Sequence, residues 1–138
     1  MSRRLGAAAC GLLVVLVSTA AACGGGAGNL TELRRVRSGA LDVVLLSPHE
    51  ALRHGKDDFI VEFRSADGKL VDVGDVRATA SMSMAGTPML GSITVQRTNV
   101  PGRYRADGEF SMAGTWRVGI QFDGPAGTAS VTFSGTVQ

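Results

Sequence analysis

From Leu41 to the C-terminus, apolar and polar residues alternate in short runs, and this period of two is the feature that most limits the fold. Turn signals such as Asp67-Gly68 and Pro101-Gly102 separate the runs. Side chains of a strand point alternately to its two faces, so each run predicts a strand with one buried face. Seven strands are expected, around 41–45, 59–63, 76–80, 93–95, 104–106, 116–122 and 131–133. About seven short strands with regular turn signals are typical of an all-β, immunoglobulin-like antiparallel β-sandwich.

The first 22 residues have the order of a secretory signal. Arg3 and Arg4 give a short cationic start, and residues 5–22 are apolar or small. Small residues then stand directly before Cys23, in an order similar to the lipobox of bacterial lipoproteins. The sequence therefore predicts a signal peptide over 1–22 and acylation of Cys23, for example with palmitate. An uncleaved membrane anchor is the alternative, because the apolar run is about as long as the shortest transmembrane helix.

Three glycines follow Cys23 and predict a flexible tether over residues 23–39, with one folded domain over residues 40–138. These features place the domain outside the cytoplasm, on the cell envelope, where its lipid holds it to the membrane. Cys10 leaves with the signal and Cys23 is acylated, so the folded part retains no thiol. A disulfide and a thiolate metal site are therefore both excluded.

The charges of the remaining chain are balanced, since the fourteen Lys and Arg residues include Arg3 and Arg4 and there are twelve Asp and Glu residues. The one local bias, Arg34-Arg35-Val36-Arg37, is interpreted as a solvated strand edge, with contact to anionic headgroups as the alternative. No basic patch is interleaved with aromatic residues, which argues against nucleic-acid binding. No serine stands in a nucleophile elbow, and the glycines are scattered turn residues. An enzyme is therefore not expected.

Apart from the initiator, every methionine lies in one of two short segments that share the residues Met-Ala-Gly-Thr or a close variant. Met82, Met84 and Met89 belong to the first segment and Met112 to the second. One interpretation is core packing, because Met82 and Met84 continue the alternation of the 76–80 strand and methionine fills irregular gaps. The other is a copper(I) site, because thioether sulfur is a soft ligand.

The copper interpretation predicts that Met84 and Met89 lie close together across a tight connection over residues 85–88. Met112 precedes the strand that begins at Trp116 and could reach the same end of the sandwich. Met82 is the weakest candidate ligand, because it lies deeper in the row. One of the two histidines, His49 or His54, could join the site.

Those histidines are five residues apart, an interval that suits neither one helical face nor one strand face. A solvated loop is the simpler interpretation, with Asp57 and Asp58 nearby for a harder ion. Trp116, the only tryptophan, could cap a metal site, but a tryptophan in this kind of sandwich is usually part of the core.

Several motifs occur in the order seen in YtkA-like domains, which are small exported bacterial β-sandwiches. They are Leu46-Ser47-Pro48, Gly55 with Phe59-Ile60-Val61, Asp67-Gly68-Lys69, the first methionine segment, Pro101-Gly102-Arg103-Tyr104, and the stretch from Phe110 to Trp116. The resemblance covers about residues 40 to 137, and Gly114-Thr115-Trp116 also resembles the related FixH family. Both families occur near copper handling, metal efflux and oxidase assembly, so the resemblance implies support of an extracytoplasmic metal or redox enzyme.

Two functions are therefore expected. The first is a membrane-anchored lipoprotein that binds or delivers copper(I) through its methionines, with a metal transporter or an oxidase-assembly protein as its partner. The second is a metal-free module that docks on an envelope transporter or oxidase.

The lipid anchor can be tested directly at its cysteine. Replacing Cys23 by Ala should release the protein from membranes, because the acyl chain is the predicted attachment. Mass spectrometry of the mature protein should show an acylated N-terminal cysteine. A Cys23→Ala protein that stays membrane-bound would contradict the prediction.

Overall fold

Eight antiparallel strands and no helix make up the part of the chain that the computed structural model describes, residues 29–124 and 127–138. The strands are β1 (Thr31–Ser38), β2 (Leu41–Ser47), β3 (Gly55–Arg64), β4 (Val76–Met84), β5 (Thr87–Arg97), β6 (Arg103–Phe110), β7 (Gly114–Gly124) and β8 (Gly127–Val137). The predicted signal peptide and Cys23 lie outside the described residues. Within the described ranges, no helix has the length and hydropathy needed to cross a membrane.

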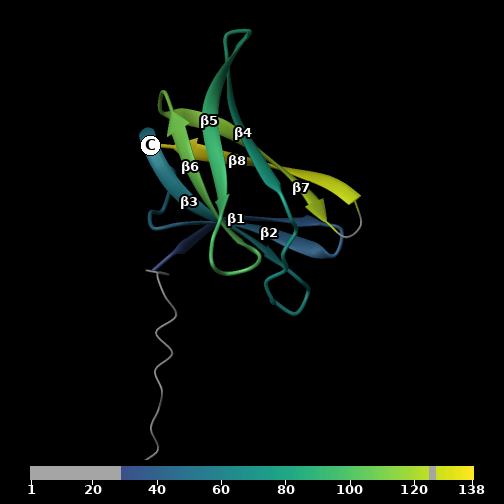
Figure 1. The fold of residues 1–138 in the computed structure, drawn as a ribbon. Coiled ribbons are helices and arrows are strands. Elements are labelled where there is room, and N and C mark those ends of the chain that lie inside the picture. The colour runs from purple at the N-terminus through teal and green to yellow at the C-terminus, as the bar shows by residue number, and fades with distance from the viewer. Residues whose placement is uncertain (1–28, 125–126) are drawn as a thin grey trace, which may run out of the picture.

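The strands follow the order β1-β2-β3-β6-β5-β4-β7-β8 and fold into two facing layers (Figure 1). β5 belongs to both layers, because residues 87–91 pair with β4 and residues 92–97 pair with β6. The first layer is β1-β2-β3-β6, and the second is β4-β7-β8. The all-β sandwich predicted from the alternation is confirmed, with eight strands instead of about seven.

The additional strand is β1, which occupies residues that the sequence analysis assigned to the flexible tether over 23–39. β1 pairs with β2 along its whole length, so the tether prediction is wrong for residues 31–38. The pairing register shifts between Glu32 and Arg34, which marks a β-bulge. The bulge places the two apolar residues of the strand, Leu33 and Val36, three positions apart although both pack on the core. Because Leu33 and Val36 are three positions apart, the strand does not show the alternation of apolar and polar residues by which the other strands are recognised.

Trp116 on β7 lies at the centre of the core and has no exposed surface. Its indole Nε1 donates a hydrogen bond to the carbonyl of Met112, 3.0 Å away, and its ring meets Phe110 edge-on at 5.4 Å between centroids. Gly91 crosses above this ring, where a Cβ would lie 3.1 Å from the indole and 2.9 Å from the Glu109 carbonyl oxygen. β5 therefore needs glycine at the position where it changes layers.

A second aromatic group closes the opposite part of the core. Phe63 contacts Tyr104 edge-on at 5.5 Å and Phe122 at 4.8 Å between centroids. The Tyr104 hydroxyl is within hydrogen-bond distance of two acceptors, the Gly74 carbonyl at 2.8 Å and the Asp72 carboxylate at 3.1 Å, and its hydrogen can be donated to either. The Gly74 amide, the Tyr104 hydroxyl and a nearby arginine together hold the pKa of the Asp72 carboxyl below its usual range. The loop between β3 and β4 is thereby fixed to β6.

One carboxylate is buried on the outer face of the first layer. Glu62 has a side chain only 2% exposed, and it accepts hydrogen bonds from Arg64 at 2.7 Å and Arg103 at 3.0 Å. Two guanidinium groups compensate this buried charge, as a carboxylate out of water requires. The cluster is structural, and its groups satisfy one another.

Truncation of Trp116 should show how much the fold depends on it. Trp116→Ala should lower the free energy of unfolding by about 3–5 kcal/mol, because it empties the centre of a packed core. Urea denaturation measures this loss. Leu90→Ala is the matched control, because Leu90 is 76% exposed and should change stability by less than about 0.5 kcal/mol. Equal effects in the two variants would contradict the prediction.

Candidate metal centre

A hairpin of β4 and β5 projects beyond the neighbouring strands at one end of the sandwich (Figure 1). Pairing of β4 with β7 stops at Ser81, and pairing of β5 with β6 starts only at Ser92. The two strands are joined by Ala85 and Gly86, which have φ values of 38° and 86°. Two successive residues with positive φ form the tight hairpin turn that matches strand twist.

This turn is shorter than the connection over residues 85–88 that the sequence analysis expected, and it changes which methionines meet. Met84 pairs with Thr87, and Met82 pairs with Met89. Paired residues lie on the same face of a sheet with Cβ atoms about 5 Å apart, whereas diagonal neighbours are about 7–8 Å apart. Met82 is therefore the residue opposite Met89, and Met84 is diagonal to it.

The second methionine segment reaches the same place from the loop between β6 and β7. The Ser111 hydroxyl donates a hydrogen bond to the Met89 sulfur at 3.0 Å. A Cβ on Gly114 would overlap the methyl group of Met82. Met112, between these two residues, is half-buried and packs on the core.

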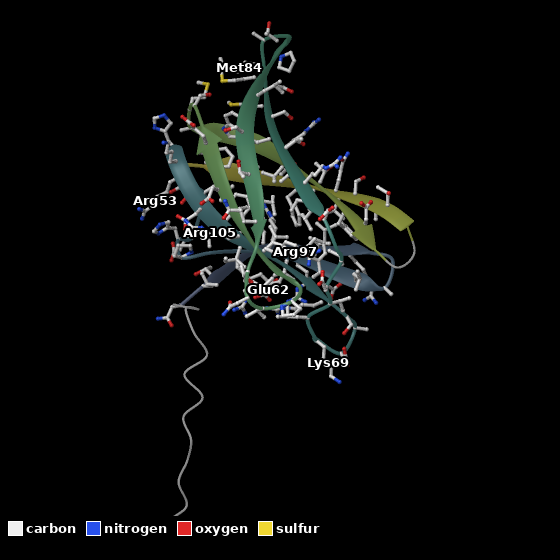
Figure 2. All side chains as sticks on the ribbon, in the orientation of Figure 1. Arg53, Glu62, Lys69, Met84, Arg97 and Arg105 are labelled. Atoms are coloured by element: carbon white, nitrogen blue, oxygen red, sulfur yellow. The ribbon has the colours of Figure 1, made fainter. Side chains whose placement is uncertain are left out.

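All four methionines of the described chain therefore come together at one end of the sandwich, and the yellow sulfur atoms in Figure 2 gather near the labelled Met84. Met82, Met89 and Met112 are half-buried, whereas Met84 is 39% exposed at the projecting hairpin. The arrangement combines both sequence interpretations, because three of the thioethers pack on the core and the fourth is open to solvent.

The structure also brings a histidine to this end. His54 Nε2 lies 3.1 Å from the Ser111 carbonyl oxygen. A carbonyl oxygen can only accept, so Nε2 carries the hydrogen and the lone pair is on Nδ1. His49 and His54 line one open groove of about 790 Å³ together with Ala113, the residue after Met112. His54 is exposed and His49 is half-buried, and the loop that carries them borders the second methionine segment.

Sequence reasoning missed the roles of Ser111 and Gly114 and the position of His54. The His54 loop reaches the site because its backbone joins the end of β8, with His54 N–H donating to the Gln138 carbonyl at 2.7 Å. This contact spans most of the chain and has no local sequence signal. The repeated Met-Ala-Gly-Thr segment was the one signal that pointed to these two residues, because Ser111 directly precedes it and Gly114 is part of it.

The donor atoms at this end suit soft ions. Within residues 29–124 and 127–138, no group of three or more His, Cys, Asp or Glu side chains could hold a metal ion. Thioethers are ligands for copper(I) and do not suit hard ions. The donor atoms available at this end are therefore the thioether sulfurs, with the imidazole of His54 nearby.

Comparison with protein families decides what kind of domain this is. The sequence profile described as YtkA-like matches residues 35–121, which is more than half of the chain. The chain belongs to the YtkA-like family. No curated protein matches this YtkA-like chain significantly.

Solved structures similar to this YtkA-like domain include FetP of uropathogenic Escherichia coli strain F11. A copper-bound variant of FetP is 8% identical, with a TM-score of 0.52 over 79% of this chain and 97% of that chain. FetP as isolated is 9% identical, with a TM-score of 0.47 over 76% and 93%. The filamin domain of Lin-41 is 20% identical, with a TM-score of 0.46 over 64% and 81%. At 8% identity, the similarity to the copper-bound FetP variant is evidence for the fold of this domain alone.

The contact between Gly114 and Met82 gives a test of the site geometry. Gly114→Ala should lower the free energy of unfolding by about 1 kcal/mol or more, because φ is 141° and the new methyl would displace the Met82 methyl. Denaturation measures the loss, and the methyl resonance of Met82 should shift in NMR spectra. Gly135→Ala is the control, since a Cβ there meets nothing within 4 Å. Loss of stability in both variants alike would contradict the predicted contact.

Proposed function

We propose that this YtkA-like domain binds copper(I) at the methionine end of the sandwich and serves as an exported, membrane-anchored copper carrier. The observation that carries the proposal is the pairing of Met82 with Met89, with Met84 on the same face and Met112 brought in by the Ser111 contact. The role that we propose for this arrangement is binding.

Thioether chemistry supports a carrier that works outside the cytoplasm. A thioether is neutral and needs no deprotonation before it binds a metal, whereas thiolate and imidazole sites lose affinity as they are protonated. Copper(I) is a soft ion for which sulfur ligands are preferred. Such a site can therefore hold copper in an exported domain from which free thiols are absent.

Burial divides the roles of the four methionines. Met82, Met89 and Met112 are positioned by the core and supply a preformed set of donors. Met84 is 39% exposed on the projecting hairpin, so it is the ligand best placed to meet incoming or departing copper. The Ser111 hydroxyl engages one lone pair of the Met89 sulfur and leaves the second for a metal. An open ligand beside three ordered ones suits transfer to a metal transporter or an oxidase-assembly protein.

The similar fold of the copper-bound FetP variant agrees with this proposal but does not carry it. An N-terminal signal peptide and an acylated Cys23 would place the domain at the outer surface of the cell membrane. Copper handling in that compartment is also what resemblance to the YtkA-like and FixH families implies.

Anaerobic titration with copper(I) against a competing chelator tests the proposal. The wild type should bind copper(I) stoichiometrically, and the triple variant Met84→Leu, Met89→Leu, Met112→Leu should lose binding while keeping its apolar bulk. Leu90→Ser is the matched control, because Leu90 is on the opposite face of the same hairpin and should not affect binding. Absence of binding by the wild type, or equal binding by the triple variant, would overturn the proposal.

A second function is favoured by the exposed apolar surface of the hairpin. Leu90 is 76% exposed and Met84 39% exposed, so the hairpin could dock on an envelope transporter or oxidase without any metal. In that case Leu90→Ser would impair the function of the partner, and the triple Met→Leu variant would keep it. If the protein is a copper carrier, the triple Met→Leu variant should impair function and Leu90→Ser should leave it intact.

A further inference from the structure

The two ends of the strand order, β1 and β8, are the edges of the sheet, and they are protected very differently. β1 carries Glu32, Arg34, Arg35 and Arg37 and contains a bulge, which are devices that prevent pairing with another chain. β8 has eleven residues without a charge, a proline or a register shift. Its outward side chains are hydroxyls of Thr and Ser. β8 is thus a long, regular and unprotected edge.

Part of this edge is already covered. The end of β8 is joined to the histidine loop, with Gln138 N–H donating to the Leu52 carbonyl at 2.8 Å. Nearer the middle, Arg34 Nε donates to the Ser134 carbonyl at 3.3 Å. Among the described residues, no other strand pairs with the free edge over residues 128–133, since β7 lies on the opposite side. A row of backbone donors and acceptors is available there.

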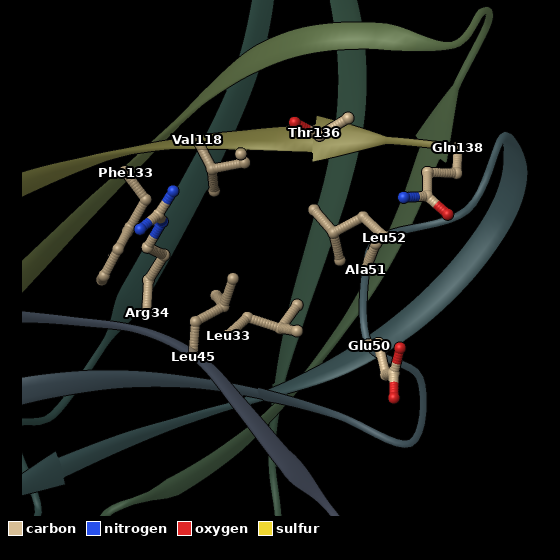
Figure 3. Close-up of a pocket in the computed structure, with 11 residues that line it drawn as sticks. Leu33, Arg34, Leu45, Glu50, Ala51, Leu52, Val118, Phe133, Thr136 and Gln138 are labelled. Carbon is tan, nitrogen blue, oxygen red and sulfur yellow. The ribbon is translucent and has the colours of Figure 1, made fainter.

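Where the free edge ends, a pocket of about 220 Å³ opens between β1, residues 50–52 and the covered end of the chain, which lines it with Phe133, Gly135, Thr136 and Gln138 (Figure 3). Its apolar lining consists of Leu33, Leu45, Leu52, Val118 and Phe133. A cavity of about 150 Å³ can hold a benzene ring, so this pocket has room for one Leu or Phe side chain. Arg34 and Glu50 lie at opposite ends of the pocket (Figure 3).

Arg34 gives the pocket a charge preference. Within the described ranges it forms no ion pair with a carboxylate, whereas the adjacent Arg35 is paired with Glu32 at 2.9 Å and with Asp42 at 3.4 Å. The neutral carbonyl of Ser134 is a weaker acceptor for a guanidinium than a carboxylate is. A ligand with a carboxylate at this end would therefore be favoured.

We propose that the free edge of β8 is a strand-addition site for an extended acidic segment of a partner protein. The segment would pair with the backbone of residues 128–133, place one apolar side chain near its end in the pocket and present a carboxylate to Arg34. Main-chain pairing supplies affinity in this mode of recognition, and the side-chain pocket supplies specificity. The site shares no residue with the proposed copper ligands, so its test is independent of the copper proposal.

A second copy of the chain is a poorer occupant. β1 lies beside β8, as the Arg34 to Ser134 hydrogen bond shows. Pairing β8 with β8 of another copy would therefore bring two arginine-bearing β1 strands toward each other, and like charges at such an interface are unfavourable. An acidic partner would instead be attracted by the arginines of β1.

A blocked seven-residue peptide tests the proposal: it alternates Thr and Val and carries one Asp near an end. NMR titration of the full domain with this peptide should shift the backbone amides of residues 128–133 and slow their hydrogen exchange. A second peptide with Lys in place of Asp should bind about tenfold more weakly, because it loses a hydrogen bond to a charged group. A third peptide with Gly in place of the Val nearest the Asp should also bind more weakly, because it leaves the pocket empty.

Two variants of β1 distinguish the effect of the Arg34 charge from a general effect on folding. Arg34→Gln should abolish the preference for the Asp peptide, while Arg37→Gln should keep it, because the Arg37 side chain is bound to the Gly39 carbonyl away from the pocket. Both residues are exposed, so both variants should fold, which their spectra check. Three outcomes would overturn the proposal: unchanged β8 amides with any peptide, equal behaviour of the two variants, or dimerisation through β8 without peptide.

Discussion

The packing of Trp116 beneath β5 is the interaction on which the rest of the structure depends. β5 leaves one layer and joins the other at Gly91 and Ser92, directly above the indole. Because glycine has no side chain, the strand can cross at contact distance and still bury the ring completely. The layers are linked at this point, and the hairpin beyond it is free to project.

The same tryptophan also anchors the loop that carries Met112, through the hydrogen bond from its indole to the Met112 carbonyl. The methionine end is therefore a continuation of the core and not a separate attachment. This explains why Met82 and Met89 are half-buried and yet lie close to solvent. Packing and metal binding are compatible here, because an unbranched thioether can fill a gap and still present a lone pair.

The two edge strands of the sandwich, β1 and β8, differ in how they are protected. β1 is charged and bulged, and β8 is neutral and regular. The charges and the bulge protect β1 against pairing with another chain, whereas the free part of β8 has no such protection. The domain thus has two separate surfaces, a sulfur-rich end and a pairing edge. One protein could use the first for its ligand and the second for its position in an assembly.

The sequence by itself determined seven of the eight strands and which of their faces is buried, because alternation reflects burial of one face of a strand. Trp116 and Phe122 could be placed inside on this basis. β1 could not be found, because its bulge separates Leu33 from Val36 by three positions. The confinement of the methionines to two segments was visible in the sequence.

Only the tertiary structure decided which of those methionines meet. The turn at Ala85-Gly86 sets the register, and the register pairs Met82 with Met89. His54 reaches Ser111 across 57 positions of the chain, through contacts that leave no local pattern. Periodicity records burial along one strand, whereas register and long-range contacts depend on how separate strands are brought together.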